Sequence, residues 1–218
     1  RGVLTLGDHA QAGSDGQPGP ALTASQGRVT VPSTPVSPLN RASIKGFNEV
    51  WFRKAPRRRI GELQRIAPFF YPLDAVASWN RLYGRGGFIQ YQFAVPDSGS
   101  DLVRLTLERL SQIHAPSFLS VLKRFGPGRA ASPLSFPVQG WTLALDIPTG
   151  VDGLAGVLDD LDERVVAAGG RIYLAKDARV RPEHLGAMYP RLDEWRTVRG
   201  RLDPDGVLQS DLARRLGL

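Results

Sequence analysis

Two lysines on apolar, strand-like segments are the residues of this chain best placed to do chemistry. In residues 171–176, side-chain alternation along a strand would put Lys176 on one face with Ile172 and Leu174. Lys123 repeats the pattern in a second such segment. A cation on an apolar strand face is costly unless it is paired or reaches water, so two of them predict a pocket for an anionic ligand. Lysines that extend to solvent from strand ends would give the same pattern, and the spacing leaves that alternative open.

The sequence carries no other catalytic signature. No Gly-x-Gly-x-x-Gly and no P-loop follows a predicted strand, and the glycine-rich run 84–87 precedes a strand, which is typical of a turn. The three histidines lack metal-ligand spacing, so no metal is expected. One predicted helix carries a group of acidic side chains, which we interpret as a solvated face rather than an acid–base pair. These are Asp159, Asp160, Asp162 and Glu163.

The composition is that of an ordinary globular protein. At 218 residues, 42% hydrophobic and 22% charged, the chain can form one domain or two small ones with a core. No apolar run is long enough to span a bilayer, and no targeting signal is found. The lack of cysteine excludes disulfides and thiolate chemistry, but leaves the location open between the cytoplasm and the cell envelope. Because the chain opens on Arg1 rather than Met, we expect a fragment or a processed product.

The net charge of +7 favours anionic partners such as nucleic acid, anionic lipid or phosphorylated ligands. The densest basic cluster, residues 53–59, follows the aromatic pair Trp51 and Phe52. Aromatic and basic side chains together can bind single-stranded nucleic acid, but a solvated arginine-rich loop has the same composition. No nucleic-acid-binding motif accompanies the cluster, so we expect no nucleic acid partner.

The chain is expected to comprise three segments. Residues 1–46 are rich in Gly, Pro and Ser and are expected to be loop-rich or mobile, with one short strand at 28–31. Residues 47–180 are expected to form a substrate-binding domain that begins with a strand at 47–52. Residues 181–218 are expected to form a C-terminal helical segment. Its helices are predicted at 182–188, 192–202 and 211–216.

The clearest periodicities predict the order β-α-β-β-α-β. The strands are expected at 88–95, 118–125, 140–147 and 171–176, and the helices at 101–114 and 154–168. This order is typical of a ferredoxin-like unit, an α+β fold with an antiparallel sheet and both helices on one face. On the other face, the first and third strands carry small or polar side chains, which invite a ligand or a second layer. They are Gln90, Gln92, Thr142, Ala144 and Asp146.

Seven strings, in order along residues 47–218, together resemble one family of flavoproteins. They are Trp51–Lys54, Trp79–Arg81, Phe88–Phe93, Leu134–Pro137 with Gly140-Trp141, Tyr173–Asp177, Met188–Arg191 with Asp193–Trp195, and Ser210-Asp211 with Ala213–Leu216. The strings are similar to the C-terminal half of the FAD-dependent oxidase subunits of decaprenylphosphoryl-β-D-ribose 2-epimerases. Those subunits are vanillyl-alcohol-oxidase-like flavoproteins and relatives of the aldonolactone oxidases.

The resemblance implies an FAD-dependent oxidoreductase that oxidises the 2-hydroxyl of a polyprenyl-phosphate-linked ribose to a ketone. The FAD is expected to bind mainly to an N-terminal half that this chain lacks, so the piece alone is expected to be inactive. A separate NADH-dependent keto-reductase would then complete an epimerisation that supplies cell-wall arabinan in actinobacteria. The lipid-phosphate sugar substrate leaves association with a membrane surface open.

The resemblance also implies roles for single residues. Lys176 matches a lysine that lies beside the flavin ring and the substrate and is the catalytic candidate, while Tyr173 and Ala175 match residues at the flavin. The remaining matches line the substrate pocket, and two of them depart from the family, where an asparagine and a cysteine are common at the positions of Thr142 and Ala144. These pocket residues are Gln90, Gln92, Val121, Lys123, Thr142 and Ala144.

Two alternatives stay open at this point. One is an FAD-linked oxidase of the same class that acts on a free sugar, an alditol or an aldonolactone. The other is a non-enzymatic basic module that binds through residues 53–59.

Overall fold

The computed structural model describes residues 3–10, 29–33, 35, 37–71, 75–128 and 132–218. The chain divides into two compact units, Arg1–Arg85 and Gly86–Leu218. This division differs from the three expected segments, because the C-terminal helices share a unit with the sheet. Within the expected loop-rich segment 1–46, residues 1–2, 11–28, 34 and 36 lie outside the described residues. None of the helices in the described ranges is long and apolar enough to cross a membrane.

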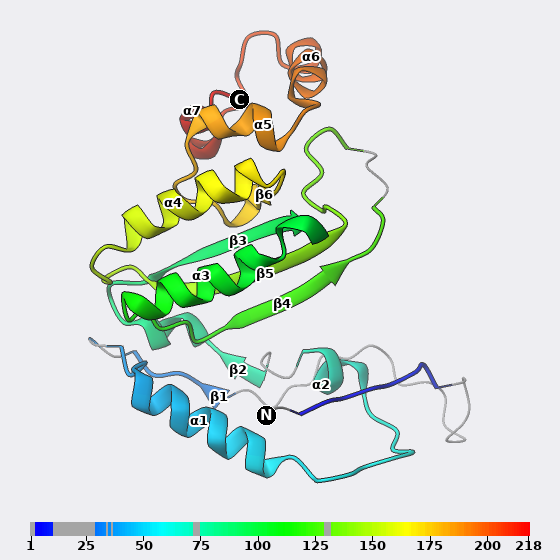
Figure 1. Ribbon diagram of the computed structural model, residues 1–218, viewed down its shortest axis with the longest axis vertical. Coiled ribbons are helices and arrows are strands. Elements are labelled where there is room, and N and C mark those ends of the chain that lie inside the picture. The colour runs from blue at the N-terminus through cyan, green and yellow to red at the C-terminus, as the bar shows by residue number, and fades with distance from the viewer. Residues whose placement is uncertain (1–2, 11–28, 34, 36, 72–74, 129–131) are drawn as a thin grey trace. The chain divides into compact units, whose positions relative to one another are not determined.

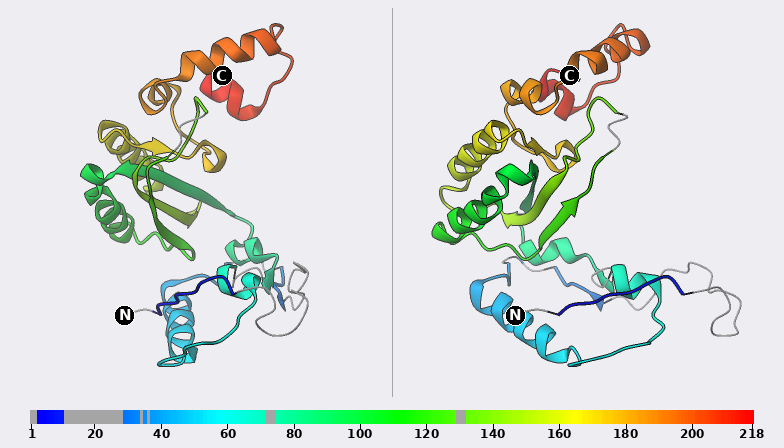
Figure 2. Two further views of the ribbon diagram at one scale, coloured as in Figure 1. Left: turned by 90° about the vertical axis from the view of Figure 1, so that its right-hand side faces the viewer. Right: turned by 45° about the vertical axis from the view of Figure 1, so that its right-hand side comes forward.

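The larger unit is built on a four-stranded antiparallel sheet (Figure 1). Its strands are β3 (Phe88–Pro96), β4 (Ser120–Phe125), β5 (Gly140–Pro148) and β6 (Arg171–Ile172), in the spatial order β4-β5-β3-β6. Helices α3 (Asp101–Gln112) and α4 (Leu154–Ala167) lie on one face of this sheet (Figures 1 and 2). The predicted α+β fold with its β-α-β-β-α-β order is confirmed.

The core forms between the sheet and its helices because apolar residues alternate along the two central strands. Phe93 and Val95 of β3 and Ile147 of β5 are fully buried. They belong to one cluster with Leu158 and Leu161 of α4, which are also fully buried. Alternation then leaves the intervening side chains of β3 and β5 on the opposite face, which carries no helix of this pair. We call that surface the open face.

The C-terminal helices belong to the same core. They are η5 (Pro182–His184), α5 (Leu185–Met188), α6 (Leu192–Leu202) and α7 (Asp211–Leu216), close to the predicted ranges. Tyr189 and Leu216 are buried in the cluster that the sheet forms, and the Tyr189 hydroxyl donates to the Ile172 carbonyl at 3.0 Å. The C-terminal helical segment is therefore attached to the edge strand β6.

The smaller unit corrects one prediction. Residues 47–52, predicted as a strand, lie within helix α1 (Arg41–Lys54). The Asn40 side chain accepts from the backbone N–H groups of Ala42 and Ser43, and Ser43 completes a capping box, which is a strong helix start. Elsewhere in this unit β1 (Val29–Thr30) pairs in parallel with β2 (Val76–Ala77), so the short strand expected near residue 29 is present. Helix α2 (Ile66–Phe70) and the 3-10 helix η2 (Trp79–Tyr83) complete the unit.

A glycine at the start of β5 gives a test of the sheet. Gly140 has φ +144°, and a Cβ there would lie 2.2 Å from the carbonyl oxygen of Val95 on β3. We expect Gly140→Ala to lower the free energy of unfolding by about 2–3 kcal/mol, because a backbone oxygen cannot move aside without breaking the β3–β5 pairing. Gly150→Ala, where a Cβ would meet no atom within 4 Å, is the matched control. Equal denaturant midpoints for the two variants would contradict this expectation.

Candidate functional site

The open face gathers all the residues that were predicted to line a substrate pocket. The register places Gln90 opposite Asp146 and Gln92 opposite Ala144 across β3 and β5. On the other side of β5, Val121 lies opposite Ala144 and Lys123 opposite Thr142. Facing partners in antiparallel strands point to the same side of a sheet, so these side chains form one continuous surface. Their position agrees with the predicted faces, and their role in binding stays a prediction.

Two hydrogen bonds order the amide side chains of this face. Gln90 Nε2 donates to Asp146 Oδ1 at 3.0 Å, and Gln92 Nε2 donates to Thr142 Oγ1 at 3.1 Å. An ionised carboxylate can only accept hydrogen bonds, so Asp146 fixes which end of the Gln90 amide turns toward it. Oε1 of Gln90 is thereby directed away from Asp146, where it can accept from a ligand hydroxyl.

Lys176 reaches this surface by a route that differs from the prediction. β6 ends at Ile172, and Leu174–Lys176 form the 3-10 helix η4, closed by the Lys176 N–H donating to the Tyr173 carbonyl at 3.0 Å. The expected strand 171–176 is therefore wrong beyond Ile172, and so is the shared face: Ile172 is buried in the core. Lys176 is half-buried. Burial raises the pKa of Asp146 on the open face, and the Lys176 charge partly offsets this rise.

The two lysines do not converge on one point. Lys123 is level with Thr142, whereas Lys176 interacts with Asp146, four residues further along β5. Four residues of strand span about 13 Å, and the lysines also lie at opposite edges of the sheet. A single small anion therefore cannot contact both ammonium groups. The predicted anion pocket is replaced by two separate cationic ends of one elongated surface.

An aromatic wall runs from Tyr173, three residues before Lys176, to Phe125, two residues after Lys123. Tyr173 continues the pairing of β6, with its N–H donating to the Gln92 carbonyl at 2.8 Å, and its ring lies 4.5 Å from that of Phe136 between centroids. Phe136 in turn packs edge-on against Phe125 at 6.0 Å. The segment that holds Phe136 is anchored by Arg171, whose guanidinium donates to the Ser135 carbonyl. Sequence reasoning assigned Phe136 no role, although it lies in one of the resembling strings.

A groove of about 670 Å³ is lined on one side by Phe136 and Tyr173 of this wall. It contains Tyr173 and Ala175, two of the residues predicted to contact the flavin, together with Trp195, Leu212 and Leu218 from the C-terminal segment. A largely apolar groove of this kind, whose lining includes the residue before Lys176, fits one edge of an isoalloxazine ring, which is planar and gains negative charge on reduction. Tyr173, Ala175 and Lys176 thus suit the predicted flavin contacts, which no direct observation tests.

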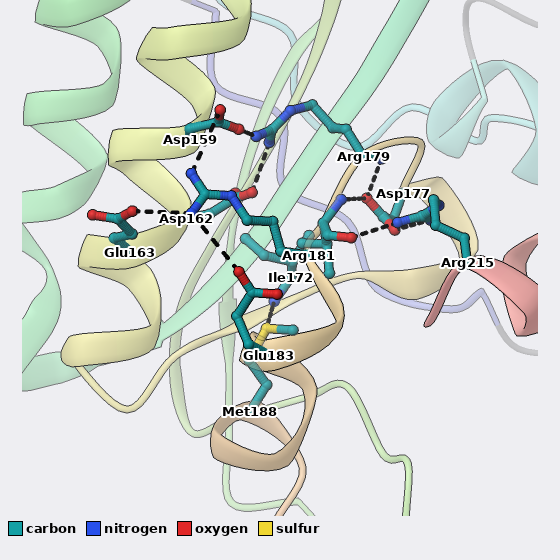
Figure 3. Close-up of polar contacts among 11 residues, drawn as sticks. Asp159, Asp162, Glu163, Ile172, Asp177, Arg179, Arg181, Glu183, Met188 and Arg215 are labelled. Carbon is teal, nitrogen blue, oxygen red and sulfur yellow. Dashed lines mark hydrogen bonds and ion pairs between the residues drawn. The ribbon is translucent and has the colours of Figure 1, made fainter. Parts of the chain in front are cut away.

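The segment after Lys176 is held by a network of ion pairs (Figure 3). Asp177 accepts from Arg215 of α7 at 2.5 Å and from the N–H groups of Arg179 and Val180 at 2.8 Å each. Arg179 pairs with Asp162 at 2.6 Å and with Asp159, both on α4. The chain on which Lys176 lies is therefore tied to two helices.

This network corrects the interpretation of the acidic helix as a solvated face. The Asp162 side chain is only 2% exposed, and burial raises its pKa to about 7. Asp160 and Glu163 do lie at the surface, where Arg164 lowers the pKa of Asp160. Within the described ranges, no group of three or more His, Asp or Glu side chains could hold a metal ion.

Comparisons with known proteins agree with the resemblance seen in the sequence. Residues 158–216 match the family described as D-arabinono-1,4-lactone oxidase. Over 82% of its length the chain is 44% identical to a decaprenylphosphoryl-beta-D-ribose oxidase of Mycolicibacterium smegmatis, covering 38% of that protein. Over 85% of its length it is 45% identical to an uncharacterized protein in the mprA 5′ region of Streptomyces coelicolor, covering 49% of it. The resemblance is confirmed, and the chain spans less than half the length of these relatives.

Proposed function

We propose that this chain is the substrate domain of an FAD-dependent oxidoreductase that oxidises the 2-hydroxyl of a polyprenyl-phosphate-linked ribose to a ketone. The observation that carries the proposal is the juxtaposition of a hydroxyl-binding surface, Gln90 and Gln92, with the Lys176 ammonium beside an aromatic groove. The 44% identity to a decaprenylphosphoryl-beta-D-ribose oxidase supports the proposed substrate class. The reaction would be the first half of an epimerisation, with an NADH-dependent keto-reductase as the partner that completes it.

Different residues along the open face would bind the sugar and stabilise the charge that develops in the reaction. The amide groups of Gln90 and Gln92 would bind the sugar hydroxyls, each amide held by a hydrogen bond to β5. Ala144 and Val121 would provide a smooth contact for the ring between them. The flavin supplies the two-electron oxidant when bound. Lys176 would stabilise the negative charge that hydride transfer places beside it, because a fixed ammonium costs no reorganisation during the reaction.

The length of the face suits a substrate that extends beyond a single sugar ring. Lys123 is exposed at the far end, about 13 Å along the strands from the level of Asp146. In a β-linked phosphoribose the phosphate is attached to the carbon next to the 2-hydroxyl, so the extended Lys123 side chain would reach along the face to contact it. A free sugar or an aldonolactone has no such anion, so a role for Lys123 in phosphate binding would favour the lipid-phosphate substrate over these alternatives.

The proposed function is tested with the full-length flavoprotein under anaerobic conditions. We expect polyprenyl-phosphoryl ribose to bleach the flavin absorbance in a single turnover, with a 2-keto sugar as the product. Free ribose, an alditol and an aldonolactone serve as the comparison substrates. Faster bleaching by any of these three would replace the lipid-phosphate assignment with the free-sugar oxidase, and no bleaching by any of the four would overturn the proposed function.

The 218-residue chain alone is expected to hold no FAD tightly. Its glycine-rich run 84–87 precedes a strand and is not followed by a helix that could bind the pyrophosphate, and the groove at Tyr173 fits only one edge of the ring. Gel filtration of the chain after incubation with FAD should therefore give a colourless protein peak. A yellow peak with one FAD per chain would show that this unit contains the main cofactor site.

Lys123 is predicted to act on affinity. In the full-length enzyme, Lys123→Met should raise KM for the lipid-phosphate substrate about tenfold while kcat changes little, because one charge-assisted hydrogen bond to a non-reacting group is lost. Arg104→Met removes an exposed cation from α3, on the other side of the sheet, and is the matched control. An effect on kcat alone would place Lys123 at the reacting carbon and contradict this assignment.

A further inference from the structure

Asp146 is a buried carboxylate with one unused oxygen. The residue is 2% exposed, and while Oδ1 accepts from Gln90, Oδ2 is buried without a hydrogen-bond partner among the described residues. An unpaired buried oxygen of this kind is costly, and native proteins rarely keep one without a use. Its position on the open face, between Gln90 and the Lys176 charge, makes a ligand the natural partner for Oδ2.

The open face contains no other carboxylate. Asp146 is the one acidic residue in the described strands of the chain. The groups near it are the Gln90 amide from β3 and the Lys176 ammonium from η4, and the Asp146 N–H donates to the Leu119 carbonyl at 3.1 Å. Lys123 is the other ionisable group predicted to contact substrate, and it lies at the far end of the face. Of these groups, only an ionised carboxylate can take up a proton.

We propose that Asp146 is a catalytic residue, the general base that binds the reacting hydroxyl through Oδ2 and takes its proton as hydride leaves the carbon. The proposal rests on the proposed function, which it extends to a residue outside the predicted pocket set. Alcohol oxidation needs such an acceptor, because the hydroxyl proton must leave when the carbonyl forms. The sequence signal was the single acid in the alternating run 141–147.

The step balances in atoms and electrons. The O–H bond breaks and its proton passes to Oδ2, the oxygen lone pair forms the C=O double bond, and the C–H electron pair departs as hydride to the oxidised flavin. The products are the ketone, the two-electron-reduced flavin and a neutral Asp146. The proton returns to solvent before the next turnover.

The environment suits a base that works at neutral pH. Burial raises the pKa of Asp146, and this outweighs the opposite effects of the Gln90 hydrogen bond and the Lys176 charge. A carboxylate with a raised pKa is a stronger proton acceptor than an exposed one. The Lys176 charge reduces the free-energy cost of ionising the buried Asp146 carboxyl. The ammonium would therefore assist both the base and the flavin.

Asp146→Asn in the full-length holoenzyme tests the assignment. The amide keeps the shape but cannot accept the proton, so flavin reduction at saturating substrate should slow about 100-fold. The wild-type rate should rise with pH as Asp146 ionises, and this acid limb should vanish in the variant, whereas the bound flavin spectrum should not change. Asp160→Asn on α4, which removes a surface carboxylate on the other side of the sheet, is expected to keep both rate and profile.

A second variant keeps the test decisive if the amide disturbs Gln90. Asp146→Ala with added formate should recover flavin reduction in a saturable way, because formate can occupy the space of the lost carboxylate and accept the proton. A substrate analogue without the 2-hydroxyl should bind the wild type and Asp146→Asn with equal affinity. Wild-type bleaching together with an unchanged rate and pH profile in Asp146→Asn would overturn the proposal alone. Wild-type protein that no sugar bleaches would instead overturn the proposed function.

Discussion

Replacing Lys176 by methionine in the full-length flavoprotein is expected to slow substrate-driven flavin reduction by about 100- to 1000-fold, or roughly 3–4 kcal/mol in the barrier. Methionine keeps much of the stem and loses the charge. The loss is large because the η4 turn places the ammonium beside the open face, so it stabilises developing charge there with little reorganisation. Rapid mixing under anaerobic conditions measures the rate from the decay of flavin absorbance.

The same variant should also alter the pH profile. The Lys176 charge lowers the pKa of Asp146, so its removal raises that pKa, and the acid limb of the reduction rate should move to higher pH. Lys176→Arg should restore charge but not full rate, because a planar guanidinium cannot replace a compact ammonium at one point. Lys45→Met on α1 is the control for loss of a lysine. If Lys176→Met reduced its flavin at the wild-type rate, the catalytic assignment of Lys176 would be wrong, and Lys176 would be a lysine that simply extends to solvent.

Side-chain alternation made much of the site predictable. Gln90, Gln92, Thr142 and Ala144 were assigned to one face from a period of two, and the register of β3 with β5 places them there. The fold class followed from the same signal, because apolar residues at alternate positions require a helix layer on one side only. Long, strongly periodic strands allow little freedom of orientation, so a local pattern determined a global arrangement.

The errors arose where local pattern competes with contacts distant in sequence. Residues 171–176 alternate like a strand, but the pairing with β3 ends at the hydrogen bond from the Tyr173 N–H to Gln92, and the chain then turns into η4. Asp162 looked solvated because its partner, Arg179, lies 17 residues away on a loop without periodicity. The aromatic and apolar residues within 47–52 suggested a strand. The capping box at Asn40, seven residues before Phe47, instead starts helix α1, which includes them.

The network around Arg179 matters for function because it holds the segment that follows Lys176. The Arg179 side chain is 20% exposed and bridges two aspartates of α4, of which Asp162 is 2% exposed. Through Asp177 the same loop is tied to Arg215 of α7. Without Arg179, two carboxylates would remain close together with one of them buried, and residues 177–181 would lose their attachment to α4.

Arg179→Met is therefore expected to destabilise the 218-residue chain by on the order of 3 kcal/mol, the low end for breaking a buried ion pair since the arginine is not fully buried. The measurement is the free energy of unfolding from denaturant titration near pH 8. The matched control is Arg164→Met, which removes an exposed arginine from an i,i+4 pair with Asp160 on the same helix. Its expected cost is about 0.5 kcal/mol or less.

The pH dependence separates a lost ion pair from lost packing. Burial already raises the pKa of Asp162 to about 7, and removal of the guanidinium should raise it further. A carboxyl with a higher pKa in the folded state than in the unfolded state binds more protons when folded, so its contribution to stability improves as pH falls through the folded pKa. The deficit of Arg179→Met should thus shrink between about pH 8 and pH 5. A deficit that is equal at both pH values would mean that Arg179 acts through its aliphatic stem and that its charge does not hold the Lys176 loop in place.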